Sequence, residues 1–191
     1  MNLSGGDGYR GRVPLGKDYD RQDCALARAL EVVGERWTML VLRDCFFGVR
    51  RFADLRAHLD IPRAVLSDRL ATLVDAGILE RRPYAAGRDE YVLTEDGLDL
   101  WPALFSLARW GDRHRVGPGG GRRRFRHADC PAGGADLAAG AVCPACGTLP
   151  APSSLETRAL DPDDDDGTRP ERDDAVSRAL RRPHRLLAPL P

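Results

Sequence analysis

The chain has 191 residues, of which 42% are hydrophobic, and its 29 basic and 29 acidic side chains give a formal net charge of zero. This length allows one globular core with appendages. No apolar run is long enough to span a membrane, and residues 1–20 lack the apolar centre of a signal peptide, so we expect a cytoplasmic protein. A uniformly basic nucleic-acid-binding chain is excluded, so any DNA-binding surface must come from local clusters of arginine.

Two helices are predicted near the N-terminus, after a Gly-rich and polar stretch over residues 1–19 that is typical of a flexible arm. The first helix covers Cys24–Val33 and is followed by Gly34. The second covers Trp37–Phe47 and is strongly apolar, which is typical of a helix inside a core. Cys45 lies in this second helix and is expected to be an ordinary core residue.

Two further helices follow in close succession, as in a helix-turn-helix. Phe52–Leu59 is predicted as the first, and only Asp60 and Ile61 separate it from Pro62. Proline suits a helix start, because its missing N–H is not needed there and its φ is already helical. The second helix then has one apolar stripe, formed by leucines that repeat at i, i+4 and i+7: Leu66, Leu70 and Leu73.

A short β-hairpin is predicted next. Gly77 ends the preceding helix, the strands cover Ile78–Arg82 and Glu90–Leu93, and Gly87 and Arg88 lie at the tip. Helix, turn, helix and a hairpin with a basic tip together predict a winged helix-turn-helix over residues 20–115. Such a fold is mainly α with a small β-hairpin wing, and it places one helix in the major groove of double-stranded DNA.

The candidate DNA-reading face follows from the same helical periodicity. With the leucine stripe turned inward, Ala64, Ser67 and Asp68 turn outward, and Arg63 and Arg69 flank them. Arginine can pair with a guanine edge through two hydrogen bonds, and serine can contact a base or a phosphate. Arg50 and Arg51 suit phosphate contacts, and Arg88 at the wing tip suits the minor groove. Each of these arginines taken alone could equally be an ordinary solvated side chain.

A second unit, which contains cysteine and histidine residues, is predicted over residues 122–150. His127, Cys130, Cys143 and Cys146 form the pattern H-x2-C-x12-C-x2-C, whose spacing lets four side chains meet one tetrahedral ion. The intervening residues are small and loop-like, so the unit would gain its folding energy from a structural zinc ion. Two alternatives stay open: incidental cysteines in a floppy tail, or a redox-active Cys143–Cys146 dithiol. No thioredoxin-like βαβ pattern surrounds that dithiol.

The remaining C-terminal sequence, residues 151–191, is predicted to be a mostly disordered tail, because it contains the acidic run that begins at Asp161. A glycine-rich joint over residues 117–121 separates the winged unit from the Cys/His unit.

Near the other end of the chain, Cys24 begins the first helix, where a helix N-terminus stabilises a thiolate. Asp23 opposes that effect, so Cys24 is either a redox-sensing candidate or a partly buried structural cysteine.

Residues 24 to about 113 resemble the HxlR-type winged helix-turn-helix transcriptional regulators, which are related to MarR-type regulators. The resemblance rests on ALARALEVVGERWTMLVLRD after Cys24, on GVRRFADLRAHLDIPRAVLSDRLATLVDAGILERRPY from Gly48, and on YVLTEDGLDLWPAL from Tyr91. It implies a homodimer that binds a pseudo-palindromic operator. In some members a cysteine at the position of Cys24 senses oxidants or electrophiles.

The resemblance also implies that the N- and C-terminal helices form the dimer interface. Thr94 can cap the helix that follows the hairpin. The segment from Leu98 to Trp110 carries too much apolar surface for a helix of an isolated monomer. The interface candidates are Leu26, Leu30, Leu98, Trp101, Leu104, Phe105 and Trp110. The aromatic and leucine residues between 101 and 110 could instead complete the core of a monomer.

The predicted function is therefore a sequence-specific, homodimeric DNA-binding regulator of transcription. The alternatives are a winged-helix protein-interaction module and a thiol-based redox-sensing regulator. An enzyme is not expected, because the sequence offers no nucleophile–base pair and no phosphate-binding loop.

Overall fold

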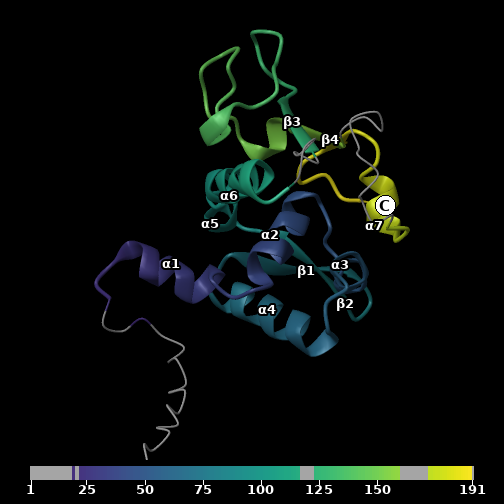
Figure 1. The fold of residues 1–191 in the computed structure, drawn as a ribbon. Coiled ribbons are helices and arrows are strands. Elements are labelled where there is room, and N and C mark those ends of the chain that lie inside the picture. The colour runs from purple at the N-terminus through teal and green to yellow at the C-terminus, as the bar shows by residue number, and fades with distance from the viewer. Residues whose placement is uncertain (1–18, 20–21, 117–122, 160–171, 191) are drawn as a thin grey trace, which may run out of the picture.

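The computed structural model describes residue 19 and residues 22–116, 123–159 and 172–190. The predicted N-terminal arm, apart from Tyr19, the glycine-rich joint and the acidic run from Asp161 lie outside these described residues. Within them, no helix is both long and apolar enough to cross a membrane. The helices and strands follow in the order α1 Ala25–Val33, α2 Thr38–Phe46, α3 Phe52–Leu59, α4 Arg63–Asp75, β1 Leu79–Ala85, β2 Arg88–Leu93, α5 Glu95–Leu98, α6 Trp101–His114, β3 Arg123–His127, η1 Ala139–Ala141, η2 Pro152–Ser154, β4 Leu155–Ala159, α7 Ala175–Ala179 and β5 His184–Arg185 (Figure 1).

The winged helix-turn-helix predicted from the sequence is confirmed. Helix α3 has the predicted bounds, and α4 begins at Arg63 directly after its N-cap, Pro62. The leucine stripe of α4 is fully buried, at 0% to 1% exposure. Strands β1 and β2 pair antiparallel, with Leu79 opposite Leu93, and extend further toward the tip than predicted. A bridge from Arg51 to Glu90 joins the start of α3 to the wing.

Helices α5 and α6 complete the core of this single chain. The Thr94 side chain accepts a hydrogen bond from the Gly97 amide at 3.2 Å, so the predicted cap is confirmed. Trp101 packs against Phe46 at a ring-centroid distance of 5.2 Å and against Phe105 at 5.8 Å. Because burial of aromatic surface is a large stabilising contribution, these residues anchor α6 to α2.

Helix α1 stands apart from this core. Figure 1 shows it extending away from the body formed by α2, α3 and α4. Ala27 is its one buried residue, whereas Leu26 and Leu30 are 65% and 38% exposed. An amphipathic helix gains stability mainly by burying its apolar face, and in this chain alone α1 leaves that face largely in water.

The C-terminal part of the chain folds into a second sheet, which corrects the prediction of a mostly disordered tail over residues 151–191. Its strand order is β3–β4–β5, and all pairs are antiparallel. Its Cys/His-containing loops lie at the top of Figure 1, above α6. Phe125 of β3 packs against Trp101 at 5.3 Å and Phe105 at 5.6 Å between ring centroids. The two sheets are thus joined through one shared apolar core, and the unit extends beyond the predicted boundary at residue 150.

A segment from His184 to Leu190, here called the C-terminal strap, returns to the winged unit. The Leu187 amide donates to the Phe46 carbonyl at 2.8 Å, and the Leu190 amide donates to the Gly48 carbonyl at 3.2 Å. Gly48 has φ +83°, and a Cβ there would lie 1.8 Å from the Ala188 carbonyl oxygen. Only glycine allows the backbone turn and the close approach of the strap at this position.

Candidate DNA-binding surface and metal cluster

The outward face of α4 has the side chains predicted from its periodicity. Ala64, Ser67 and Asp68 are all exposed, while the leucines on the other side of the helix are buried. Helix α4 has 13 residues and is preceded by a proline that favours the helical start. Helix α4 is therefore held by its buried face and exposes small and polar groups.

Two arginines beside this face are held by aromatic rings. The Arg63 guanidinium lies 5.6 Å from the ring centroid of Phe52, and that of Arg51 lies 5.1 Å from the ring of Tyr84 on the wing. Both arginines are exposed. A cation held over an aromatic face loses less conformational freedom when it binds a partner. Arg51 and Arg63 are thus preoriented on the surface that joins α3, α4 and the wing.

Arg50 and Arg69 are placed differently from the exposed arginines. The Arg50 guanidinium donates to the Leu187 carbonyl at 2.8 Å and lies 3.4 Å from Glu90. Its side chain is 23% exposed, so it links the strap to the wing and is not a freely available phosphate-binding group. Arg69 lies 3.6 Å from Glu35 with a side chain that is 21% exposed.

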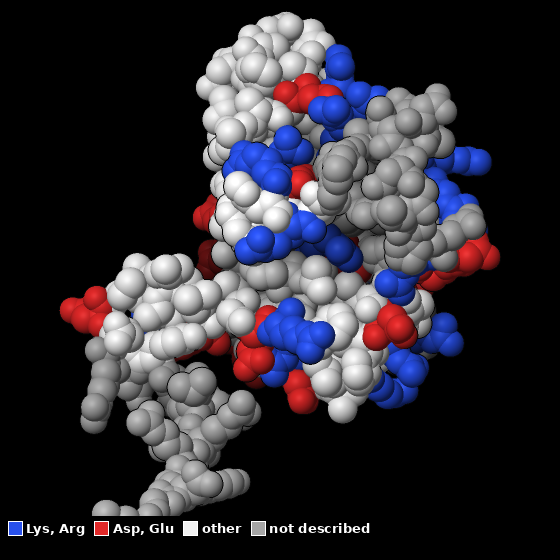
Figure 2. All heavy atoms as spheres, in the orientation of Figure 1, with Lys and Arg blue, Asp and Glu red and all other residues white. Residues whose placement is uncertain are grey.

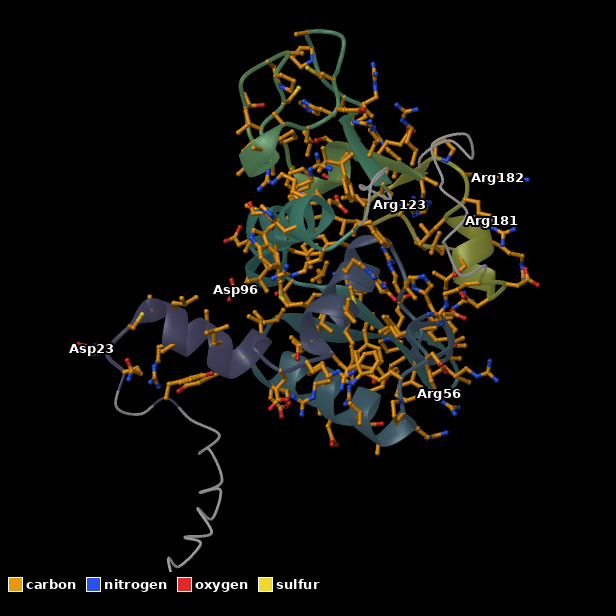
Figure 3. The ribbon with its side chains drawn as sticks, in the orientation of Figure 1. Asp23, Arg56, Asp96, Arg123, Arg181 and Arg182 are labelled. Carbon is orange, nitrogen blue, oxygen red and sulfur yellow. The ribbon has the colours of Figure 1, made fainter. Side chains whose placement is uncertain are left out.

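Two further arginines are exposed, Arg88 at the start of β2 and Arg56 on α3. Arg88 is exposed and follows Gly87, whose φ of +66° forms the wing turn. Figure 3 shows Arg56 pointing outward near α3, well apart from Arg181 and Arg182 beside α7. Figure 2 shows the basic side chains in local patches among acidic ones, as expected for a chain with zero net charge. Arg56 was not among the predicted residues, although its position between two buried leucines of α3 indicates an outward direction.

The four predicted metal ligands are brought together. The ligand atoms of His127, Cys130, Cys143 and Cys146 all lie within 4.8 Å of one another. The Cys130 and Cys143 sulfurs are 3.9 Å apart, and the Cys146 sulfur is 3.5 Å from His127 Nδ1. A tetrahedral zinc ion with ordinary bond lengths holds such donors about 3.5 to 3.8 Å apart. The donor set and its spacing therefore fit a tetrahedral ion.

The surroundings of the cluster favour thiolates at the C-x2-C turn. Hydrogen bonds from the hydroxyl and amide of Thr148 lower the pKa of Cys146 to about 6. Burial raises the pKa of Cys143, but the amides of Cys146 and Ala145 and the His127 ring outweigh burial and lower it. A hydrogen bond with Cys143 raises the pKa of His127. Since metals bind the thiolate form, these shifts prepare the turn for a cation.

Burial dominates at two other cysteines. It raises the pKa of Cys130 despite hydrogen bonds from the amides of Ala132 and Gly134. It also raises the pKa of Cys45, which lies wholly inside the core as predicted. Cys24 is exposed and occupies the N-cap position of α1, so it is accessible, in contrast to the partly buried structural cysteine considered as an alternative.

Comparison with known proteins identifies the winged unit. A family model for HxlR-like helix-turn-helix proteins matches residues 32–117. An uncharacterised HTH-type transcriptional regulator of Mycobacterium tuberculosis is 50% identical over 108 residues, which is 56% of this chain and 68% of that protein. The chain belongs to the HxlR-like helix-turn-helix family. This is a family of transcriptional regulators and not of enzymes, as the sequence predicted.

Two less similar proteins also match this chain. An uncharacterised HTH-type transcriptional regulator of Bacillus subtilis, YdeP, is 29% identical over 107 residues, covering 53% of this chain and 84% of that protein. The crystal structure of PA1607, described as a candidate transcription factor, superimposes with a TM-score of 0.54 at 30% identity, covering 63% of this chain and 92% of that one. The four Cys/His residues lie beyond the residues that the HxlR-like family model matches.

The sequence did not reveal the strap. Leu187 contacts the winged unit through its backbone amide and carbonyl, and such contacts do not depend on the type of side chain. The one available signal was the apolar set Leu186, Leu187 and Leu190, which is unusual for a disordered end.

Proposed function

We propose that this HxlR-like protein is a sequence-specific DNA-binding regulator that acts as a homodimer on a pseudo-palindromic operator. The observation that carries the proposal is the exposed face of α4, flanked by the ring-held Arg51 and Arg63 and by Arg88 at the wing tip. A winged helix-turn-helix docks such a helix in the major groove, and arginines beside it contact base edges and phosphates.

The homodimer is supported by exposed apolar side chains on α1 and on the outer face of α6. Leu26, Leu30, Leu107 and Trp110 are each at least 38% exposed. Trp101, Leu104 and Phe105, which were interface candidates from the sequence, are buried within the single chain at 7% or less and belong to its core. Leu98 is half-buried. The proposed interface therefore consists of the α1 face and the outer face of α6.

Operator binding is tested by selecting duplexes from a random pool with the wild-type protein and then measuring affinity by mobility shift. Arg63→Ala should weaken binding of the selected duplex by roughly 10-fold to 100-fold, the value of one specific arginine contact. Arg124→Ala, an exposed arginine of β3, should leave the affinity unchanged. The affinity of the wild type should also fall steeply with salt, as counterions are released.

The opposite outcomes favour the interaction-module alternative. If no duplex is enriched and the residual binding disappears near physiological salt, the proposal of a sequence-specific regulator fails. A protein partner held by apolar surface would depend less on salt than DNA does.

We also propose that His127, Cys130, Cys143 and Cys146 hold one structural zinc ion. Three thiol ligands and one imidazole in a closed, mostly buried set are typical of structural zinc and not of a catalytic site, which keeps an open position. Elemental analysis of the purified protein should find one zinc ion per chain. Cys146→Ser should reduce the zinc content strongly, whereas Cys24→Ser, which removes an exposed thiol outside the cluster, should not. Equal zinc content in both variants would refute the assignment.

A further inference from the structure

The strap is fastened to the helix-turn-helix at one end. Its amides at Leu187 and Leu190 donate to carbonyls at the end of α2, and its Leu187 carbonyl accepts from Arg50. Arg50 directly precedes Arg51, whose backbone bridges to the wing. The strap therefore contacts the short connection between α2 and α3. This connection sets the orientation of α3 and the wing relative to α2.

The other end of the strap is fastened to the metal-binding unit. The Leu186 amide donates to the Leu155 carbonyl at 2.9 Å, and Leu155 pairs with the ligand His127 in the sheet. Arg185 also donates to both carboxylate oxygens of Asp129 at 2.7 Å. Asp129 lies between the ligands His127 and Cys130 in the chain. One Arg185 nitrogen makes both of these charge-assisted hydrogen bonds, which tie the strap to the chain between two ligands.

The loops that carry the ligands contain few buried apolar side chains. Between Cys130 and Pro150 the buried apolar side chains are Leu137 and Ala141, while several of the glycines there adopt positive φ. A metal ion would therefore supply much of the energy that orders these loops. Without it, Asp129, which lies between two of the ligands, loses the geometry to which Arg185 of the strap is attached.

We propose that binding of a zinc ion to the Cys/His cluster is coupled through the C-terminal strap to the helix-turn-helix, so that zinc strengthens operator binding. The proposal rests on the DNA-binding and zinc-binding functions argued above and adds a link between them. Zinc orders the ligand loops, Asp129 in these loops holds Arg185, and the strap that begins beside Arg185 then fixes the segment from Phe46 to Arg50. Coupling between two sites is reciprocal, so operator binding must raise zinc affinity by the same factor.

The link itself is tested without DNA by amide hydrogen exchange of the full chain with and without Zn²⁺. Zinc should slow exchange at the Leu187 and Leu190 amides, which donate to Phe46 and Gly48. Arg185→Gln should abolish this slowing while zinc still binds. Arg158→Gln, an exposed arginine of the same sheet, should behave like the wild type. Slowing confined to residues 123–159 would overturn the proposal.

The consequence for function is tested with the duplex selected by the zinc-loaded wild type. Zinc should tighten binding by about 10-fold, within the usual range of allosteric coupling, and the duplex should raise zinc affinity by the same factor in competition with a chromophoric chelator. Arg185→Gln should reduce both factors to about one. Equal operator affinity with and without bound zinc would overturn the coupling. Failure to select any duplex would instead contradict DNA binding, and the exchange measurement would still decide whether zinc reaches the helix-turn-helix.

Discussion

Asp174 shows how a single carboxylate fastens the C-terminal segment. Its side chain accepts hydrogen bonds from the amide of Ser177 at 2.9 Å and from its hydroxyl at 2.6 Å, which caps the start of α7. Burial raises the pKa of Asp174, but the bonds from Ser177 and the nearby His58 and Arg172 outweigh burial and lower it. The ionised form is therefore the one that stabilises the fold.

Asp174→Ala should lower the free energy of unfolding by about 1 kcal/mol at neutral pH, the usual value of an N-cap. Asp173→Ala, which removes an exposed neighbour, should have a much smaller effect. Because the folded-state pKa is lowered, the contribution is present above the unfolded pKa and is lost as the pH falls through the folded one. Urea unfolding at neutral and acidic pH measures both variants, and an Asp174→Ala difference that grows in acid would contradict this assignment.

Neighbouring arginines are expected to differ in what they do. Arg51→Ala removes an exposed, ring-held guanidinium and should weaken DNA binding with little change in stability. Arg50→Ala leaves the Leu187 carbonyl without its donor and should lower the unfolding free energy by roughly 1–3 kcal/mol. Thermal unfolding and mobility shift on both variants give the comparison. The assignment fails if Arg51→Ala is the more destabilising of the two.

Among the elements, the contact between Gly48 and the strap gives a sharp test. Gly48→Ala would place a methyl group 1.8 Å from the Ala188 carbonyl and strain a backbone at φ +83°, so the strap must move away. Gly87→Ala has a similar φ of +66° but meets nothing within 4 Å, so it should cost only the backbone strain of about 1–2 kcal/mol. Chemical denaturation should rank Gly48→Ala well below Gly87→Ala in stability. Equal losses would mean that the strap does not press on Gly48.

The sequence predicted those elements whose pattern is local. The leucine repeat of α4 and the Pro62 start lie within one stretch of chain, so periodicity was sufficient to identify the helix. The sequence also predicted which four Cys and His side chains come together, because their spacing alone restricts the chemistry. The strap has no such pattern: it pairs with residues about 140 positions earlier through backbone groups, as the Arg50–Leu187 contact across 137 positions illustrates. Similarly, burial of Trp101 and Phe105 by Phe125 could not be separated from burial in a dimer.

At the scale of the whole molecule, the exposed apolar face of α1 predicts how two chains associate in the proposed homodimer. Leu26→Asp should shift the protein from dimer toward monomer, because it places a charge on the proposed apolar interface. Leu149→Asp is a matched control, since Leu149 is 53% exposed but lies in the Cys/His unit. Sedimentation velocity measures the mass of both variants. A dimer that survives Leu26→Asp and dissociates with Leu149→Asp would move the interface to the C-terminal unit.

The strap also imposes an order on the making of the protein. Domains generally fold as units while the chain is being synthesised, beginning at the N-terminus. Here the carbonyls of Phe46 and Gly48 accept hydrogen bonds from the amides of Leu187 and Leu190, and Phe47 and Trp101 pack against Phe125. The nascent winged unit therefore leaves the ribosome before the strap covers the carbonyls of Phe46 and Gly48 and before Phe125 covers its aromatic surface. The winged unit reaches its final packing only after residues 184–190 have been translated.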